Sequence, residues 1–166
     1  RVHPIKGVSV TVPFLVPYAA AMAFFNLRRE WILQTIAKQR ERCKDVRIPS
    51  DAEIESMRRQ AKEELPPRLA ELAVRYGFVY KRVTIKHNVS NWGSCSSKGN
   101  LNFNCILALF PIELIDSVVV HELCHRKQMN HSAKFYAEIE KVFPDYNCCR
   151  QWLKQNGNKY MSRIPK

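Results

Sequence analysis

The stretch VVVHELCHRKQMNHSAKFY, residues 118–136, carries three of the five histidines in this chain of 166 residues. An apolar run leads into His121, and the next histidine, His125, follows four residues later. Residues four apart lie on one face of an α-helix. The spacing therefore predicts a helix that presents both imidazoles on the same side, where they can reach one ion.

A third histidine, His131, follows six residues after His125. This offset equals the one in the zinc motif H-E-x-x-H-x-x-G-x-x-H, although Gln128 stands at the glycine position here. Asn130 tolerates a left-handed conformation, which would let the chain leave the helix. We expect Ser132 to cap the next helix and so to hold His131 in the connection between the two helices.

Residues His121 to His125 spell H-E-x-x-H, and the glutamate within this motif indicates catalysis rather than metal storage. Imidazole nitrogen suits Zn²⁺, and catalytic zinc sites commonly use three protein ligands and one water. We therefore expect one Zn²⁺ per chain, held by His121, His125 and His131. Glu122 is the predicted catalytic residue, because its carboxylate can accept a proton from the zinc-bound water and pass it to a leaving amine.

Apolar periodicity predicts a single α+β domain that spans residues 1–166. The second long helix begins with a capping box formed by Ser50 and Glu53, and Pro66 with Pro67 is expected to break or restart it. The predicted elements are a strand over 7–16, helices over 18–43 and 50–76, a strand over 79–87, a hairpin over 88–107, a helix opened by Pro111, a short helix from Ser132, and a last helix over 145–156 that ends at Gly157.

The second half of the hairpin shows a clear alternation of apolar and polar residues. Leu101, Phe103 and Cys105 are separated by Asn102 and Asn104. A period of two is typical of a half-buried strand. We therefore expect the three apolar side chains to face inward and the two asparagines to face outward.

Charge and cysteine content bear on partners and compartment. The chain has 27 Lys and Arg against 15 Asp and Glu, a formal net charge of +12. This excess favours DNA or another polyanion as a partner, but it equally fits a cationic surface that aids solubility, because no block of consecutive basic residues stands out.

Six cysteines without a C-x-x-C pair indicate free thiols in a reducing compartment, so we expect a cytoplasmic protein. No segment is long and apolar enough to span a bilayer. The sequence starts at Arg1 rather than at Met, so the native protein could have further residues before it.

Four segments together resemble the YgjP-like metallopeptidase family, a zincin group related to the SprT and WLM peptidases. They are WGSCSSKGNLNFN at 92–104, VVVHELCH at 118–125, NHSAKFY at 130–136 and PDYNCCRQWLK at 144–154. The resemblance implies a zinc-dependent hydrolase that cleaves peptide or protein substrates. It implies a small zincin-like domain with a short, mainly antiparallel sheet packed on helices. It also places the metal ligands at His121, His125 and His131 and the catalytic glutamate at Glu122, whereas Asn91 departs from the arginine usual in the family.

The hairpin is a candidate for substrate binding, because zincins pair an extended substrate with a sheet edge above the metal helix. Trp92, Gly93, Asn102 and Asn104 are its candidate contacts, although Trp92 also fits a place in the core. Tyr136 could supply a phenol to the oxyanion or pack on the last helices.

Three other functions stay open from the sequence alone. A deformylase-like amidase would use Cys95 with two histidines as metal ligands. A DNA-associated protease of the SprT type, or another nucleic-acid-binding protein, would use the positive charge. A domain that binds metal without turnover would have no use for Glu122. The sequence does not indicate the natural substrate or the oligomeric state.

Overall fold

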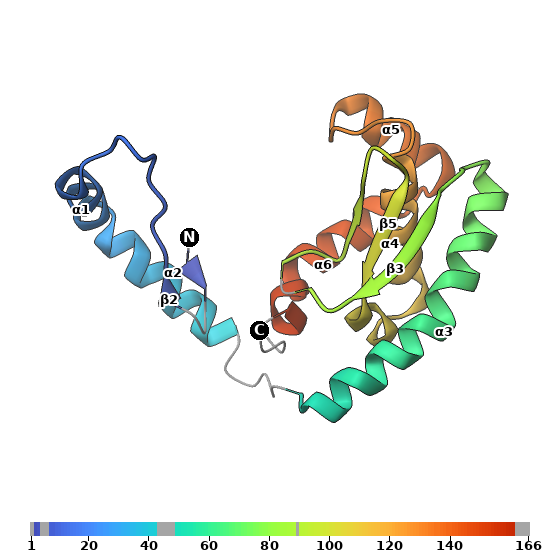
Figure 1. The fold of residues 1–166 in the computed structure, drawn as a ribbon, viewed down its shortest axis with the longest axis horizontal. Coiled ribbons are helices and arrows are strands. Elements are labelled where there is room, and N and C mark those ends of the chain that lie inside the picture. The colour runs from blue at the N-terminus through green and yellow to red at the C-terminus, as the bar shows by residue number, and fades with distance from the viewer. Residues whose placement is uncertain (1, 4–6, 43–48, 89, 162–166) are drawn as a thin grey trace. The chain divides into compact units, whose positions relative to one another are not determined.

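The computed structural model describes most of the chain, which forms two compact units (Figure 1). The described residues are 2–3, 7–42, 49–88 and 90–161, and the units are Arg1–Arg47 and Ile48–Lys166. Within the described ranges, no helix combines the length and the apolar character needed to cross a membrane. The single domain expected over residues 1–166 stays a prediction.

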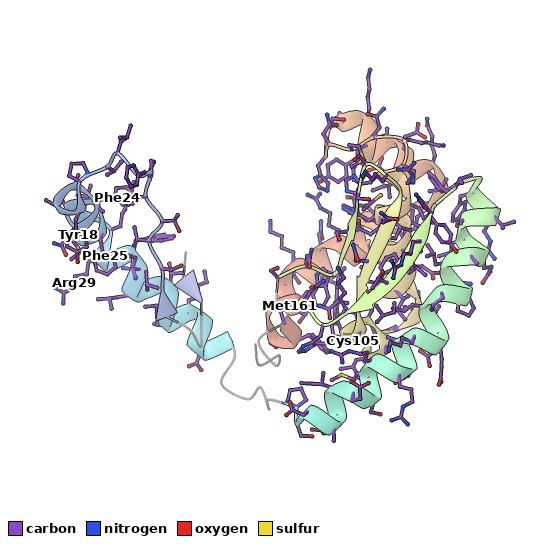
Figure 2. All side chains as sticks on the ribbon, viewed as in Figure 1. Tyr18, Phe24, Phe25, Arg29, Cys105 and Met161 are labelled. Carbon is purple, nitrogen blue, oxygen red and sulfur yellow. The ribbon has the colours of Figure 1, made fainter. Side chains whose placement is uncertain are left out.

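The first unit contains a short β-ladder and two helices. Strand β1 (Val2–His3) pairs antiparallel with β2 (Gly7–Val8), and helix α1 (Tyr18–Leu27) is followed by α2 (Arg29–Arg42). The strand predicted over 7–16 is wrong beyond Val8, because the prolines at 13 and 17 cannot donate to a ladder and a turn forms between them. The helix predicted over 18–43 is divided at Arg28. Side chains of the first unit, Tyr18 and Phe24 among them, are drawn in Figure 2.

The second unit begins with the long helix α3 (Asp51–Tyr76). Its predicted start is confirmed, since Ser50 and Glu53 form a capping box, and it ends at Gly77 in the left-handed conformation. The expected break at Pro66 and Pro67 is wrong, because the helix continues through both prolines. An unbroken line of buried side chains explains this continuity, since packing of that face outweighs the lost hydrogen bonds. These side chains are Ile54, Met57, Ala61, Leu65, Leu69 and Leu72.

A three-stranded sheet lies beside α3 in the order β3–β5–β4. Strand β3 (Arg82–Lys86) runs parallel to β5 (Asn100–Asn104), while β4 (Gly93–Cys95) forms the predicted hairpin with β5. The sheet is therefore mixed, which corrects the expected mainly antiparallel arrangement. The parallel pairing arises because the chain crosses from β3 to the far edge before it returns through β5. The α+β class is confirmed.

The alternation along β5 is only partly as expected. Leu101, Phe103 and Cys105 are fully buried, as predicted, and Cys105 opens the short 3₁₀-helix η1 (Cys105–Leu109). Asn104 is also fully buried, so its predicted outward orientation is wrong. Its amide nitrogen donates to the backbone carbonyls of Asn88 at 2.6 Å and Asn91 at 3.1 Å. These bonds satisfy the buried amide and fasten the connection that leads into β4.

Helix α4 (Ile112–Cys124) is the centre of the second unit and carries the H-E-x-x-H motif. Pro111 precedes its first turn, as predicted. The helix lies behind the sheet in Figure 1 and packs against β4, α3, α5 and α6. Its Val119, Val120 and Leu123 are fully buried, so the backbone that presents the histidines is fixed by packing on several sides.

Two helices follow the motif, α5 (Ala133–Val142) and α6 (Tyr146–Met161). Ser132 occupies the predicted cap position but makes no capping hydrogen bond through its side chain. The left-handed conformation expected at Asn130 is wrong, since only two glycines among the described residues have positive φ. Gly157 does not end the last helix. A β-carbon there would lie 2.6 Å from the Trp92 ring, so this glycine permits close packing of α6 on the indole.

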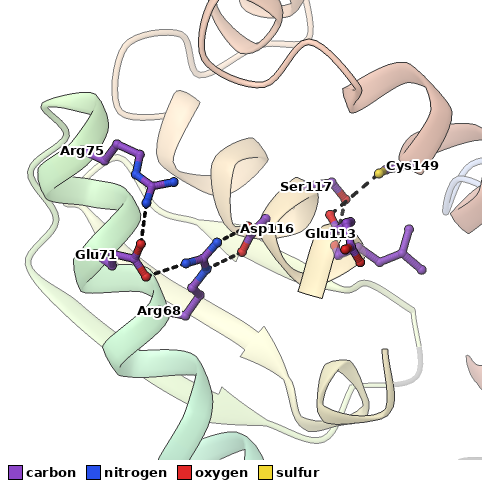
Figure 3. Close-up of polar contacts among 8 residues, drawn as sticks. Arg68, Glu71, Arg75, Glu113, Asp116, Ser117 and Cys149 are labelled. Atoms are coloured by element: carbon purple, nitrogen blue, oxygen red, sulfur yellow. Dashed lines mark hydrogen bonds and ion pairs between the residues drawn. The ribbon is translucent and has the colours of Figure 1, made fainter. Parts of the chain in front are cut away.

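An ion pair joins α3 to the motif helix. Arg68 Nε donates to Asp116 Oδ1 at 2.7 Å, and a second donor of the same guanidinium bonds the other carboxylate oxygen (Figure 3). Asp116 is buried, and the hydrogen bond to it raises the pKa of Arg68 above its ordinary value. The neighbouring pair of Arg75 and Glu71 is more exposed, so we expect it to contribute less. The buried pair therefore helps to fix α4 against α3.

Candidate metal centre

The three predicted histidines meet at one place in the second unit. His121 comes from the last turn of α4, His125 from its C-cap, and His131 from the connection before α5. One ring nitrogen from each lies within 4.8 Å of the others, and the Nε2 atoms of His121 and His131 are 3.0 Å apart. Local helix geometry brings the first two together, and the turn after α4 brings back the third.

The remaining ring nitrogens hold two of the imidazoles in orientation. His121 Nδ1 lies 2.7 Å from the hydroxyl of Tyr146, and His125 Nδ1 lies 3.0 Å from the carbonyl oxygen of Gln128. A ring that donates through Nδ1 keeps a lone pair on Nε2, which is the arrangement of a metal-binding histidine. Tyr146 was not singled out from the sequence, because it is 25 residues from its partner and no local pattern joins them.

Burial disfavours the charged form of the His121 and His125 imidazoles. It lowers the pKa of His121 to about 3, with the neighbouring His125 and His131 as further causes, and it lowers the pKa of His125 as well. The fully buried ring of Phe135 lies against all three, with centroid distances of 4.9 Å to His121, 4.4 Å to His125 and 4.9 Å to His131. The three rings therefore converge over an apolar base.

Glu122 lies beside this group in a tight, nearly dry position. Its side chain is buried, and burial raises its pKa to about 8. Its Oε2 atom forms no hydrogen bond with any described residue. A β-carbon at Gly93 of β4 would lie 2.7 Å from Cγ of Glu122 and 2.8 Å from Oε1. The glycine, predicted as a substrate contact, therefore provides the space that the carboxylate occupies.

These groups open into a cleft of about 780 Å³. Its lining includes the three histidines and Glu122, together with Trp92, Gly93, Cys95, Tyr136, Tyr146, Arg150 and Lys154. Asn102 and Asn104 do not line it, and Asn102 instead donates to the hydroxyl of Ser94 at 3.2 Å. Trp92 is half-buried and packs on Phe110, with 5.2 Å between ring centroids, so it serves both the core and the cleft wall.

The types of residue in the candidate metal site bear on the choice between a peptidase with three histidine ligands and a deformylase-like amidase with a cysteine ligand. Within the described part of the chain, the group suited to a metal contains three histidines and no cysteine. Cys95 lines the cleft but is not in that group, which does not favour a deformylase-like set of ligands. The described cysteines are free thiols, and Cys43 lies outside the described residues. A cytoplasmic location stays a prediction.

The three convergent imidazoles and the adjacent buried carboxylate together define a candidate hydrolytic metal centre. A family model described as the YgjP-like metallopeptidase domain matches residues 47–156. The chain therefore belongs to the YgjP-like metallopeptidase family. This match confirms the resemblance seen in the sequence and the prediction of a metallopeptidase.

Two solved structures are similar to part of the chain. One is the metallopeptidase zymogen of Pyrococcus abyssi abylysin, with a TM-score of 0.48 and 24% identity over 54% of this chain and 93% of that one. The other is the metallopeptidase zymogen of Methanocaldococcus jannaschii jannalysin, with a TM-score of 0.47 and 25% identity over 55% of this chain and 92% of that one. No curated protein matches the chain.

Proposed function

We propose that the protein is a zinc-dependent peptidase in which His121, His125 and His131 hold one Zn²⁺ and Glu122 handles the proton. The convergence of three imidazoles on one point is the observation that carries this proposal. Two nitrogens bound tetrahedrally at about 2.0–2.1 Å from one zinc ion lie roughly 3.4 Å apart. The 3.0 Å between the Nε2 atoms of His121 and His131 needs only a small adjustment to fit.

Bound Zn²⁺ would supply the Lewis acidity that activates water and polarises the scissile carbonyl. In its ionised form, Glu122 would then accept the proton of the attacking water and donate it to the leaving nitrogen. The hydrogen-bonding capacity of Glu122 fits this role, because its Oε2 atom is buried beside the histidine group and has no hydrogen-bond partner among the described residues. Burial of the carboxylate also keeps bulk water from competing for that proton.

An extended substrate would pair with β4, which is an edge strand of the sheet. This strand lies against the motif helix, and its Gly93 contacts Glu122. Main-chain pairing at an edge positions a peptide without demanding particular side chains. Trp92 would then contact the substrate from the cleft wall, and Tyr136 is our candidate to donate to the oxyanion.

The test is a peptide-library digest with the zinc-loaded protein, before and after a chelator removes the metal. We expect cleavage by the loaded protein, none after chelation, and recovery when Zn²⁺ is added back, because chelation removes the Lewis acid that lowers the pKa of the attacking water and polarises the carbonyl. Cleavage products would be identified by mass spectrometry. Equal cleavage with and without metal would contradict the proposal.

Tyr146 is expected to position His121 for metal binding. Loss of such an outer hydrogen bond typically weakens metal affinity by about 10- to 100-fold, so we expect Tyr146→Phe to weaken zinc binding by about tenfold or more. Chelator competition measures the affinity without reference to activity. Tyr136→Phe is the matched control, since the Tyr136 hydroxyl makes no hydrogen bond to the three histidines that the structure describes. Equal zinc affinity in wild type and Tyr146→Phe would remove this role.

The positive charge does not by itself favour a second function. Along α3, basic side chains pair with acids of the same helix, as in the pairs of Arg58 with Glu55 and Arg75 with Glu71. A helix with charges of both signs gives no extended positive surface for a phosphate backbone. A DNA-associated, SprT-like role therefore stays a prediction, as does the oligomeric state.

A further inference from the structure

The wall of the cleft formed by α6 carries two cationic side chains, Arg150 and Lys154. They are four residues apart, so they lie on one face of the helix about one turn from each other. Glu122 is the sole carboxylate among the described residues that line the cleft, and it is buried against Gly93. The described part of this wall is therefore positive and not balanced by acids of the cleft.

Neither cation has an ion-pair partner within the described part of the chain. The described ion pairs use Arg58, Arg68, Arg75, Lys127 and Lys141 instead. Five described cations have a carboxylate partner, whereas the two in the cleft, like others on the surface, have none within the described part of the chain. A pair of unneutralised cations beside a catalytic centre is suited to an anionic group of the substrate.

Arg150 is also held in a defined position. Its guanidinium lies over the ring of Tyr136, 4.7 Å from the centroid, and that ring lies 6.4 Å from the rings of both His131 and Tyr146. Stacking occupies the flat face of the guanidinium and leaves its N–H edges available. Those edges match a carboxylate in a bidentate arrangement, so the side chain is prepared for such a partner before substrate arrives.

We propose that Arg150 and Lys154 form a subsite for a carboxylate of the peptide substrate, close to the scissile bond. This inference rests on the proposed peptidase function and adds a substrate class to it, namely peptides with an acidic group near the cleavage point. A substrate on the edge of β4 would run through the same cleft that this face of α6 lines. The carboxylate can come from an Asp or Glu side chain or from the C-terminus of a short peptide.

Two peptide libraries separate these sources, one with free C-terminal carboxylates and one with amidated C-termini. We expect wild type to prefer acidic over neutral peptides by about 5- to 10-fold in kcat/KM, as a charge-assisted contact at a partly exposed site allows. A side-chain source gives enrichment of Asp and Glu at one position in both libraries. A terminal source gives cleavage a fixed distance from the end in the free-acid library alone.

The double variant Arg150→Gln/Lys154→Gln should bring the ratio of acidic to neutral peptides close to one, and Arg150→Glu/Lys154→Glu should reverse it in favour of basic peptides. Arg59→Gln/Lys62→Gln is the matched control. It makes the same change in net charge at exposed positions of α3 that do not line the cleft, and it should keep the wild-type ratio. An acidic preference that survives loss of both cleft cations would overturn the subsite.

Binding to Glu122→Gln protein keeps this test separate from the test of peptidase function. Fluorescence anisotropy with a labelled acidic peptide and its amide counterpart should show about 5- to 10-fold tighter binding of the acidic form, lost when the two cleft cations are replaced. Equal binding of both forms would refute the subsite even in a protein that cleaves peptides. A wild type that binds the acidic form more tightly but cleaves nothing would instead count against the peptidase.

Discussion

Replacement of Glu122 by Gln is expected to lower kcat/KM for peptide cleavage by about 10²- to 10⁴-fold, the usual contribution of a general acid–base group. An amide has nearly the same shape as the carboxylate, so it fits the space that Gly93 leaves. It cannot accept the proton of an attacking water. The measurement is steady-state cleavage of a peptide identified from the library digest, with zinc content determined on the same preparations.

The matched control for this variant lies on the same helix. Glu113→Gln makes the same substitution in the first turn of α4, where the side chain is exposed, and should cleave at the wild-type rate. Zinc content should be equal in wild type and both variants, because neither change touches an imidazole. Unchanged cleavage by Glu122→Gln at full zinc occupancy would show that another group moves the proton.

The candidate centre was accessible from the sequence because its main parts are local. A spacing of four residues places His121 and His125 on one face of any helix, and a short turn restores His131 to the same side. The structure brings ring nitrogens of all three within 4.8 Å. Tyr146 and Arg150, by contrast, come from the last helix, and no periodic pattern in the sequence records which side chains meet across a cleft.

Three errors in the predicted fold share one cause, which is tertiary packing that outweighs a local rule. Pro66 should have ended a helix, yet α3 continues because its buried face packs along the second unit. Gly157 should have been a cap, yet it lies within α6 where the Trp92 ring leaves no space for a side chain. Asn104 should have faced solvent, yet buried backbone carbonyls need its amide as a donor.

The parallel pairing of β3 with β5 was also beyond local patterns. Alternation identifies a strand and its two faces, but it does not state which neighbour the strand pairs with or in which direction. The hairpin could be predicted because the turn between β4 and β5 is short, with Gly99 at positive φ. The connection from β3 to β4 has no such turn, and the hydrogen bonds that hold it come from Asn104, more than ten residues further along the chain.

Removal of one imidazole from the centre is expected to have the largest effect on metal binding. Loss of an outer hydrogen-bond partner costs about 10- to 100-fold in affinity, and loss of a direct ligand should cost more. We therefore expect His125→Ala to weaken zinc binding by more than about 100-fold and to abolish peptide cleavage at zinc concentrations that saturate wild type. Chelator competition and zinc content after dialysis measure the first effect, and the peptide assay measures the second.

Cys95→Ser is the control that separates the three-histidine site from a site with a cysteine ligand. The Cys95 side chain lines the same cleft but lies outside the histidine group, so the variant should bind zinc as tightly as wild type. A thiolate ligand would behave differently, because serine is a poor replacement for it and affinity would fall sharply. Strong loss in Cys95→Ser with little loss in His125→Ala would reverse the assignment of the ligands.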